Sequence, residues 1–314
     1  MTRILITGGT GFIGSNLIRK LSPSNNEVHL LTRNSSDFWR ISDIQDDLNI
    51  YKVELKQKKL EDIVKKINPE LVFHCAAYGT NSKENDYSKM IKTNLHGTLN
   101  LFSALSNLNV KRIVNLGSVF EYGIKSGHRG FLETNSLNPL TFYGITKASQ
   151  TNIAQYFFKL RSLPVTTLRL FTPYGKFESK GRLVSDIMFA IINNKKLGIS
   201  SPKSVRDFIF IDDVIDAMLK ASKIPNIEGE IFNIGAGKSN PVKKIVEICK
   251  KFTNYNNDIS LLESQKRDYD ISGGKGYANV QKAKKILHWK PKNSIEQGLK
   301  KSYQWHQKHY SLYN

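Results

Sequence analysis

Residues 7–14 read Thr-Gly-Gly-Thr-Gly-Phe-Ile-Gly and directly follow the apolar run Arg3-Ile-Leu-Ile-Thr7. The run predicts a short buried strand, and the apolar spacing from about Phe12 to Leu21 predicts an amphipathic helix. A glycine-rich turn between a strand and a helix lets the backbone approach a dinucleotide pyrophosphate, which the helix N-terminus attracts. Three glycines of the turn are spaced three residues apart: Gly8, Gly11 and Gly14. The stretch therefore predicts a dinucleotide-binding turn.

Apolar runs and helical patterns alternate through the first half of the chain. The runs expected to be further strands are Glu27–Thr32, Ile50–Leu55, Leu71–Cys75, Arg112–Leu116 and Pro164–Phe171. The next helices are expected from about Tyr87 to Ser106 and onward from Pro139, with Asn138 as the cap. Strands that alternate with helices indicate a parallel sheet covered on both faces. The predicted fold class is α/β, a Rossmann-type doubly wound parallel sheet with a smaller C-terminal substrate-binding domain.

After Thr172 the pattern changes, because the apolar runs become shorter and Gly, Pro and Ser interrupt segments such as 198–204 and 272–276. We expect a dinucleotide-binding domain over residues 1–172, with later contributions from about residues 205–236. Residues 173–314 are expected to form mainly the substrate-binding domain, ending in a helix over about Ile295–His306.

Tyr143 and Lys147 lie four residues apart in Tyr-Gly-Ile-Thr-Lys, and Ser118 lies 25 residues upstream of Tyr143. Side chains four apart share one face of a helix, so the ammonium can lie near the phenol. A nearby positive charge favours the phenolate and lowers the pKa of Tyr143 towards the working pH. Such a phenol can exchange a proton with a sugar hydroxyl or carbonyl. The pair alone is a frequent coincidence in a lysine-rich chain, whereas the joint pattern with Ser118 and the glycine turn indicates catalysis.

The end of the second expected strand usually separates NAD from NADP. An acidic residue there binds the ribose hydroxyls, whereas an arginine accommodates a 2′-phosphate. This chain has Thr32-Arg33-Asn34-Ser35-Ser36, with no carboxylate before Asp37, and Arg40 follows. Arg33 can pair with a phosphate and stack on adenine, and the alternative is a solvated loop arginine. We expect NADP, with NAD as the alternative cofactor.

The chain carries 47 Lys and Arg against 27 Asp and Glu, which gives a formal net charge of +20. A nucleic-acid surface would explain this charge. Lysine is instead scattered along the whole chain, and no basic cluster is interleaved with aromatic residues. A lysine-rich composition, or a field that attracts anionic substrates, explains the charge as well. We expect no nucleic-acid partner.

No run of 18 apolar residues occurs, and Met1 leads into a strand pattern rather than a charged and then apolar leader. We expect a cytoplasmic protein with no membrane partner. The two cysteines, Cys75 and Cys249, lie in apolar segments far apart in the sequence. We expect both to be buried and reduced, and we expect no metal site.

Motifs along nearly the whole chain resemble one family. Besides the glycine turn and the Tyr143–Lys147 pair they are His74-Cys-Ala-Ala77, Asn94-Leu-His-Gly-Thr98, Gly117-Ser-Val-Phe-Glu-Tyr-Gly123, Arg169-Leu-Phe-Thr-Pro-Tyr-Gly175, Arg206-Asp-Phe-Ile-Phe-Ile-Asp-Asp213, Phe232-Asn-Ile-Gly235 and Ala283-Lys-Lys-Ile-Leu-His-Trp-Lys-Pro291. The chain resembles an extended short-chain dehydrogenase/reductase of the nucleotide-sugar epimerase, dehydratase and reductase group. The resemblance implies a nucleotide-diphosphate sugar as substrate. Jointly the motifs are specific for the group and weak on the individual reaction.

The resemblance also implies roles for individual residues. Tyr143 is the acid/base, Lys147 binds the nicotinamide ribose and tunes Tyr143, and Ser118 hydrogen-bonds the reacting oxygen. Glu54 stands where a related Asp contacts adenine. The residues expected to bind the cofactor are Gly8, Gly11, Phe12, Ile13, Gly14, Arg33, Ser36, Arg40, Glu54, Leu55, Ala76, Ala77, Asn94, Tyr143 and Lys147. The residues expected to bind the substrate are Tyr78, Val119, Phe120, Thr172, Arg182, Arg206 and Arg267. Arginine suits a nucleotide diphosphate because a guanidinium pairs with phosphate through two hydrogen bonds.

Departures from the group's motifs help to choose the reaction. Sugar 4,6-dehydratases of the group carry an Asp-Glu pair directly after the Ser or Thr, where this chain has Val119 and Phe120, which transfer no proton. Glu121 comes one place late, and in an extended segment it would face the opposite side. Thr172-Pro173 stands where sugar 4-epimerases commonly have an Asn-containing segment. It is similar to the corresponding segment of reductases that make deoxy sugars.

We therefore expect an NADP-dependent reductase of a nucleotide-linked keto-deoxy sugar, in which Tyr143 delivers a proton to the oxygen while hydride reaches the keto carbon. The alternative is an NAD(P)-dependent nucleotide-sugar epimerase that uses the same residues. A second alternative is a catalytically silent cofactor-binding regulator or RNA-binding protein. The charge of +20 motivates that alternative, and the intact Ser118, Tyr143 and Lys147 oppose it.

The two long helical patterns carry apolar residues on more than one face. They are Met90, Ile91, Leu95, Leu99, Leu101, Phe102 and Leu105 in the first, and Ile145, Ile153, Tyr156, Phe157 and Phe158 in the second. A helix that covers one sheet face needs only one apolar stripe. The surplus can pack inside the chain or form a four-helix interface about a two-fold axis. We expect a homodimer.

Overall fold

The glycine-rich turn joins strand β1 (Thr2–Thr7) to helix α1 (Phe12–Leu21), as the sequence predicts. The structure is a computed structural model, and it describes residues 1–22, 26–81, 84–123, 130–199, 202, 204–257, 259–261 and 276–313. Ile4, Ile6 and Leu17 are buried in one core cluster and Leu5 in another. The alternation follows from the two-residue repeat of a strand whose two faces are both covered.

Seven strands in the described ranges form one sheet in the order β11-β6-β5-β4-β1-β2-β3. All six neighbouring pairs in it are parallel. The strands after β1 are β2 (Asn26–Thr32), β3 (Asn49–Lys52), β4 (Leu71–His74), β5 (Arg112–Ser118), β6 (Val165–Leu170) and β11 (Ile231–Ile234). The order reverses direction between β1 and β4, so the sheet is doubly wound and the predicted fold class is confirmed.

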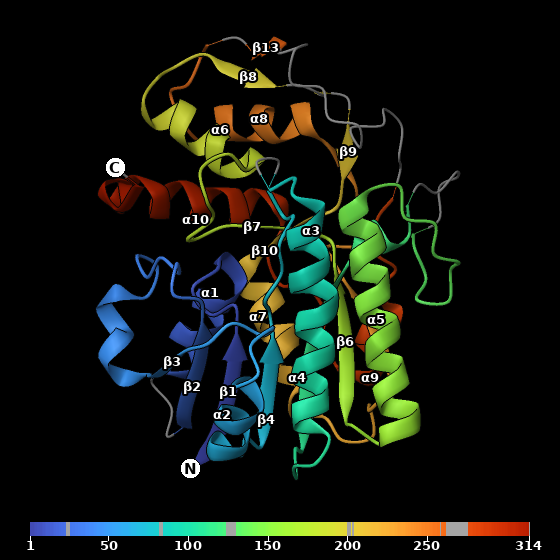
Figure 1. Cartoon of the computed structure of the whole chain (residues 1–314). Helices are drawn as coiled ribbons and strands as arrows, with labels where there is room; N and C mark the ends of the chain where they lie inside the picture. The colour runs from blue at the N-terminus through green and yellow to red at the C-terminus, as the bar shows by residue number, and fades with distance from the viewer. Residues whose placement is uncertain are drawn as a thin grey trace.

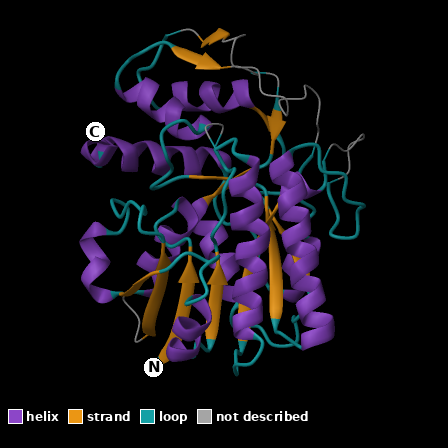
Figure 2. Cartoon of the chain, viewed as in Figure 1, coloured by secondary structure: helices purple, strands orange, loops and turns teal. Residues whose placement is uncertain are grey.

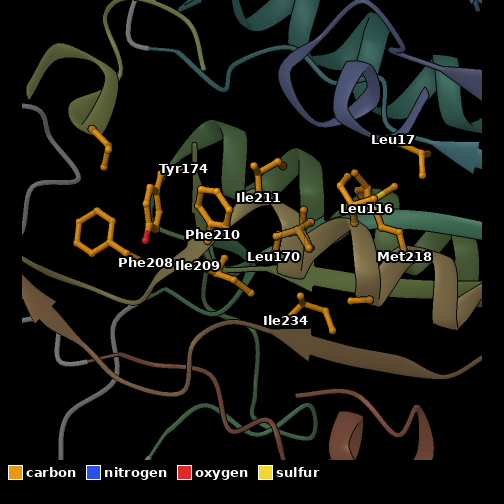
Figure 3. Close-up of a cluster of buried hydrophobic side chains, with 14 of the residues drawn as sticks. Leu17, Leu116, Leu170, Tyr174, Phe208, Ile209, Phe210, Ile211, Met218 and Ile234 are labelled. Carbon is orange, nitrogen blue, oxygen red and sulfur yellow. The ribbon is translucent and has the colours of Figure 1, made fainter. Parts of the chain in front are cut away.

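Helices cover both faces of this sheet (Figure 1). Helices α2 (Leu60–Ile67), α4 (Gly97–Leu105) and α5 (Phe142–Arg161) pack on one face, where they share a core cluster with Leu5. Helices α1 and α7 (Ile211–Ala221) pack on the other face. Figure 3 shows part of that second core, where Leu17 and Met218 approach the sheet residues Leu116 and Leu170.

Two predicted helices differ from the observed ones. The pattern from Tyr87 to Ser106 is an α-helical turn, α3 (Tyr87–Met90), then the π-helix η2 (Ile91–His96), then α4. Helix α5 begins at Phe142 rather than near Pro139, because the Thr141 side chain caps it by accepting from the Gly144 amide at 3.0 Å. The prediction of Asn138 as the cap was therefore wrong.

The remaining described elements lie mostly beyond the carboxyl ends of the sheet strands (Figure 2). They are the helices η1 (Ser42–Asp47), η3 (Val119–Glu121), α6 (Leu183–Ile192), α8 (Val242–Lys250), α9 (Gln281–Ile286), α10 (Ile295–Lys308) and η5 (Tyr310–Tyr313), and the strands β7 (Thr172–Tyr174), β8 (Leu197–Ile199), β9 (Val205–Arg206), β10 (Phe208–Phe210), β12 (Asn240–Pro241) and β13 (Ile259–Leu261). Helix α10 packs on α6, α8 and β10. The division into domains near residue 172 stays a prediction.

Candidate active site

A cleft of about 1290 Å³ opens at the carboxyl ends of β1 and β4. This is the point where the strand order reverses, and doubly wound sheets bind their ligands there. The glycine turn, the segment Cys75–Tyr78 and the side chains of Ser118, Tyr143 and Lys147 all line it. The fold thus brings together residues that are far apart in the sequence.

Two glycines of the turn lie where a side chain would clash with the protein's own backbone. Gly8 has φ +69°, and a Cβ there would lie 2.6 Å from the Ala76 nitrogen. A Cβ on Gly14 would lie 2.3 Å from the Gly8 carbonyl oxygen. Among the described residues no side chain caps the N-terminus of α1, and its first turn carries no acidic residue. Open amides and a positive helix end suit a pyrophosphate, so these residues fit a dinucleotide cofactor.

Ser118 and Tyr143 meet across the cleft from different elements. Ser118 ends β5 and Tyr143 lies in the first turn of α5, and the Ser118 hydroxyl is close enough to the phenol to favour a lower pKa of Tyr143. The Ser118 hydroxyl also accepts from the Phe120 amide at 3.3 Å. The backbone of Ser118 is held from behind, because its N–H donates to the buried Glu121 carboxylate at 2.7 Å. Two polar oxygens that face one cleft form a suitable binding site for a sugar oxygen that gains or loses a proton.

The Lys147 ammonium has hydrogen-bond partners other than the Tyr143 phenol. Its Nζ donates to the Leu116 carbonyl and to the Gln150 side-chain oxygen, each at 2.5 Å. Burial raises the pKa of Tyr143 to about 12, and the Arg182 charge and the nearby Ser118 hydroxyl oppose that rise. In this structure burial outweighs the effects that lower the pKa of Tyr143, and the expected influence of Lys147 on it stays a prediction. Burial also lowers the pKa of Lys147 to about 8, against the attraction of Glu121.

Asn94 has a different set of contacts from the one expected of a cofactor-binding residue. It is fully buried within η2, and the described lining of the cleft does not include it. Its side chain accepts from the Tyr78 N–H and donates to the Tyr78 carbonyl, both at 2.9 Å, and it donates to Thr146 at 2.9 Å. π-Helical turns often occur at functional sites. Here the turn places Asn94 where it fixes the backbone of Tyr78, which does line the cleft.

The residues expected at the adenosine end of the cofactor also line the cleft: Arg33, Ser36, Arg40, Glu54 and Leu55. Arg33 is exposed, and its backbone N–H donates to the Ser36 hydroxyl at 3.0 Å. Arg40 is buried and donates to the Phe177 carbonyl at 2.9 Å and the Ser179 hydroxyl at 2.6 Å. Arg40 therefore links the loop after β2 to the loop after β7. Arg33 is more accessible than Arg40 to a ligand phosphate in the cleft.

The residues expected to bind the substrate are distributed around the same cleft. Those in its lining are Tyr78, Val119, Phe120, Thr172, Arg182 and Arg206, and Ala76 and Ala77 also line it. Arg267 lies outside the described residues. Phe120 is 37% exposed, and its ring meets the Tyr143 ring edge-on at 5.9 Å. Arg182 pairs with Glu178, with Nε 3.0 Å from a carboxylate oxygen.

Sequence reasoning missed two buried groups next to the site and misplaced a third, Glu121. Gln150 binds Lys147, and Glu178 binds Arg182. Glu121 is not in an extended segment: it lies in η3, and its carboxylate binds Arg169 at 2.7 Å. Spacing gives a partial signal, since Gln150 follows Lys147 by three residues and Glu178 precedes Arg182 by four. The Glu121–Arg169 pair spans 48 residues and carries no such local signal.

Over the ranges that the structure describes, no three His, Cys, Asp or Glu side chains gather as a metal ion would require. No helix in those same ranges has the length and apolar character to cross a membrane.

Known proteins with a similar sequence or structure share this architecture. A family model described as the NAD dependent epimerase/dehydratase family matches residues 4–235. A UDP-glucuronate 4-epimerase from Thermodesulfobacterium geofontis is 26% identical, over 98% of this chain and 97% of that protein. A UDP-glucose 4-epimerase from Thermotoga maritima, solved with UDP-glucose, has a TM-score of 0.90 and 28% identity, and the match covers 98% of this chain and 99% of that one. MoeE5 in complex with UDP-glucose and NAD has a TM-score of 0.85 and 25% identity, with 98% and 99% covered.

Proposed function

This chain belongs to the NAD-dependent epimerase/dehydratase family, and we propose that it is a nucleotide-sugar 4-epimerase that uses NAD. The similarity to 4-epimerases of UDP-sugars over nearly the whole chain supports this reaction ahead of the keto-sugar reductase expected from the sequence. The MoeE5 complex likewise favours NAD ahead of the NADP expected from Arg33. A UDP-hexose is the substrate class that these relatives suggest.

The observation that carries the proposal is that Ser118, Tyr143 and Lys147 line one cleft together with the glycine turn. In this proposal Tyr143 takes the proton of the sugar's 4-hydroxyl, and Ser118 holds the same oxygen. NAD, when bound, supplies the reversible two-electron oxidation of the sugar carbon. The 4-keto sugar would then rotate in the cleft, so that the hydride returns to the opposite face of the carbon while Tyr143 returns the proton to the oxygen. Val119 and Phe120 offer no second acid or base, so water elimination has no proton donor at those positions.

The test uses the purified chain with UDP-glucose and with UDP-glucuronate, without added cofactor. NMR should detect the 4-epimer of at least one of them. Tyr143→Phe should lower turnover by at least about 100-fold, the usual scale for a general acid, while thermal stability stays near that of the wild type. Tyr156→Phe is the matched control, because Tyr156 lies on the same helix and is 47% exposed. Equal turnover of Tyr143→Phe and Tyr156→Phe would refute the catalytic assignment.

A keto-sugar reductase that uses NADPH is the second candidate, and Arg33 is the observation that favours it. Arg33 is exposed in the lining of the cleft, where a 2′-phosphate could pair with its guanidinium. The cofactor that copurifies with the chain distinguishes the two candidates. Tightly held NAD supports the epimerase, whereas an empty protein that binds NADPH better than NADH supports the reductase. In the second case Arg33→Asp should reverse the preference, because it replaces a phosphate partner with a charge that repels phosphate.

A further inference from the structure

Lys147 is held at the floor of the cleft by two acceptors that carry no charge. Its side chain is buried, and its ammonium donates to the Leu116 carbonyl of β5 and to the Gln150 side-chain oxygen. An ammonium has three donors and no acceptor. Two of the three are used by these partners. The third remains for the cleft, which Lys147 lines.

Gln150 is itself fixed by a chain of buried side chains. Its amide nitrogen donates to Asn115 at 2.7 Å, and the Asn115 amide donates to Thr167 at 3.2 Å. Gln150, Asn115 and Thr167 are all buried, and they lie on α5, β5 and β6. Because an ammonium only donates, the oxygen of Gln150 must face Lys147 and its nitrogen must face Asn115. The orientation of the amide therefore follows from both neighbours.

We infer that Gln150 is a positioning residue for the proposed reaction, which holds the Lys147 ammonium so that one donor points into the cleft and its positive charge is not neutralised. This inference rests on the proposed function. A carboxylate at position 150 would pair with Lys147 and cancel its charge, whereas an apolar side chain would leave the ammonium with one fixed partner. A glutamine supplies the hydrogen bond without the charge.

Other charged or titratable groups also act on the Lys147 ammonium. Glu121, on η3, favours the charged form of Lys147 and so raises its pKa. Cys75 and His74, at the end of β4, lie close enough to interact with it. Tyr143 is one turn earlier on α5. None of these groups changes in the variants below, so a shift in the titration of Lys147 between variants reports on position 150.

The experiment compares Gln150→Glu, Gln150→Leu and the control Thr151→Val. Thr151 is the next residue on α5, and its buried hydroxyl has no hydrogen-bond partner among the described residues. The readouts are the pH profile of kcat for epimerisation and the pH dependence of the NAD dissociation constant by calorimetry. Gln150→Glu should shift the alkaline limb of both profiles to higher pH by at least about one unit, since an adjacent opposite charge raises the pKa of an ammonium by about that amount. Gln150→Leu should move the limb down, and Thr151→Val should leave it in place.

Profiles that superimpose for all three variants and the wild type would overturn the inference. If Gln150→Glu does not fold, as judged by its thermal melt, Gln150→Leu and the control decide the matter. A wild-type chain that turns over no nucleotide sugar refutes the proposed function instead. The calorimetric profile then still tests the role of Gln150, because it measures binding alone.

Discussion

At the scale of single residues, the positive charge that acts most on the Tyr143 phenol is one that the spacing of the sequence did not indicate. The spacing of Tyr143 and Lys147 suggested the ammonium, but Arg182 is the cation that opposes the raised pKa of Tyr143. Arg182 also donates to the Thr80 carbonyl at 3.4 Å, and its guanidinium lies 5.8 Å from the Phe12 ring. Arg182 thus links the loop after β4 with the start of α1. Its charge acts on the Tyr143 phenol and on the Glu178 carboxylate with which it pairs.

The sequence predicted the residues Ser118, Tyr143 and Lys147 but not the direction of Lys147. A four-residue spacing tells which helix face a side chain shares, and it carries no information on what the tip of a long side chain binds. The partner that decides the direction, the Leu116 carbonyl, is 31 residues away. Local patterns cannot report such a partner, because only the closed sheet brings it near.

Glu178 is a buried carboxyl whose titration should change the stability of the fold. One of its oxygens binds Arg182, and the other is buried with no partner in the described part of the chain. Burial raises the pKa of Glu178 to about 7. A carboxyl with a raised pKa favours the folded state while it is protonated. The contribution of Glu178 to the stability of the folded state is therefore complete below the ordinary pKa of a glutamate, and it is lost as the pH rises through about 7.

We predict that Glu178→Gln flattens this fall. At pH 8 the free energy of unfolding of the variant should exceed that of the wild type by up to about 3 kcal/mol, because each pKa unit corresponds to about 1.4 kcal/mol. At pH 5 the difference should be much smaller. Urea unfolding at the two pH values measures the difference. Glu247→Gln, on an exposed face of α8, is the control and should run parallel to the wild type. A Glu178→Gln curve that is also parallel would contradict the prediction.

At the scale of elements, regular strands and the first helix could be predicted from the sequence, and the irregular turns could not. The bounds of α1 match the prediction at both ends, because the glycine turn and the apolar repeat are local signals. The π-helix η2 was missed, since its cause is non-local. Asn94 binds the backbone of Tyr78, 16 residues earlier, and that contact comes from the tertiary fold.

The cap of α5 provides a test at this scale. Thr141→Ala should cost about 1 kcal/mol of stability, the usual value for losing an N-cap hydroxyl. Asn138→Ala should change stability by less than about 0.5 kcal/mol, because Asn138 is exposed and lies before the helix. Chemical denaturation of both variants measures the two values. A larger loss for Asn138→Ala would restore the helix start expected from the sequence.

At the scale of the whole molecule, part of the apolar surplus on α4 and α5 packs inside the chain. Leu101, Phe102, Leu105 and Phe157 are buried in the core beneath these two helices. Other apolar side chains of the same helices stay exposed: Leu99, Ile145, Tyr156 and Leu160. The two helices are neighbours on one face of the sheet (Figure 1). An exposed apolar face on adjacent helices is what an isologous helical interface requires.

We predict a homodimer through α4 and α5. Light scattering at micromolar concentration should give about twice the chain mass of 35.7 kDa. The double variant Ile145→Lys with Leu160→Lys should give the monomer mass, because two buried charges have no partner in an apolar interface. Leu132→Lys is the control, since Leu132 is similarly exposed but lies outside both helices. A wild-type chain that is monomeric would contradict the prediction outright.

The strand order has a consequence for the synthesis of the chain on the ribosome. Strand β6 ends at Leu170, and its outer partner β11 begins only at Ile231, 61 residues later. At typical translation rates those residues take roughly 3 to 12 s to emerge. During that interval the nascent sheet presents an unpaired apolar edge, which is a template for association with other chains. Chaperone capture of nascent chains should therefore peak between the emergence of β6 and that of β11, and a genetic fragment that stops at residue 172 should aggregate.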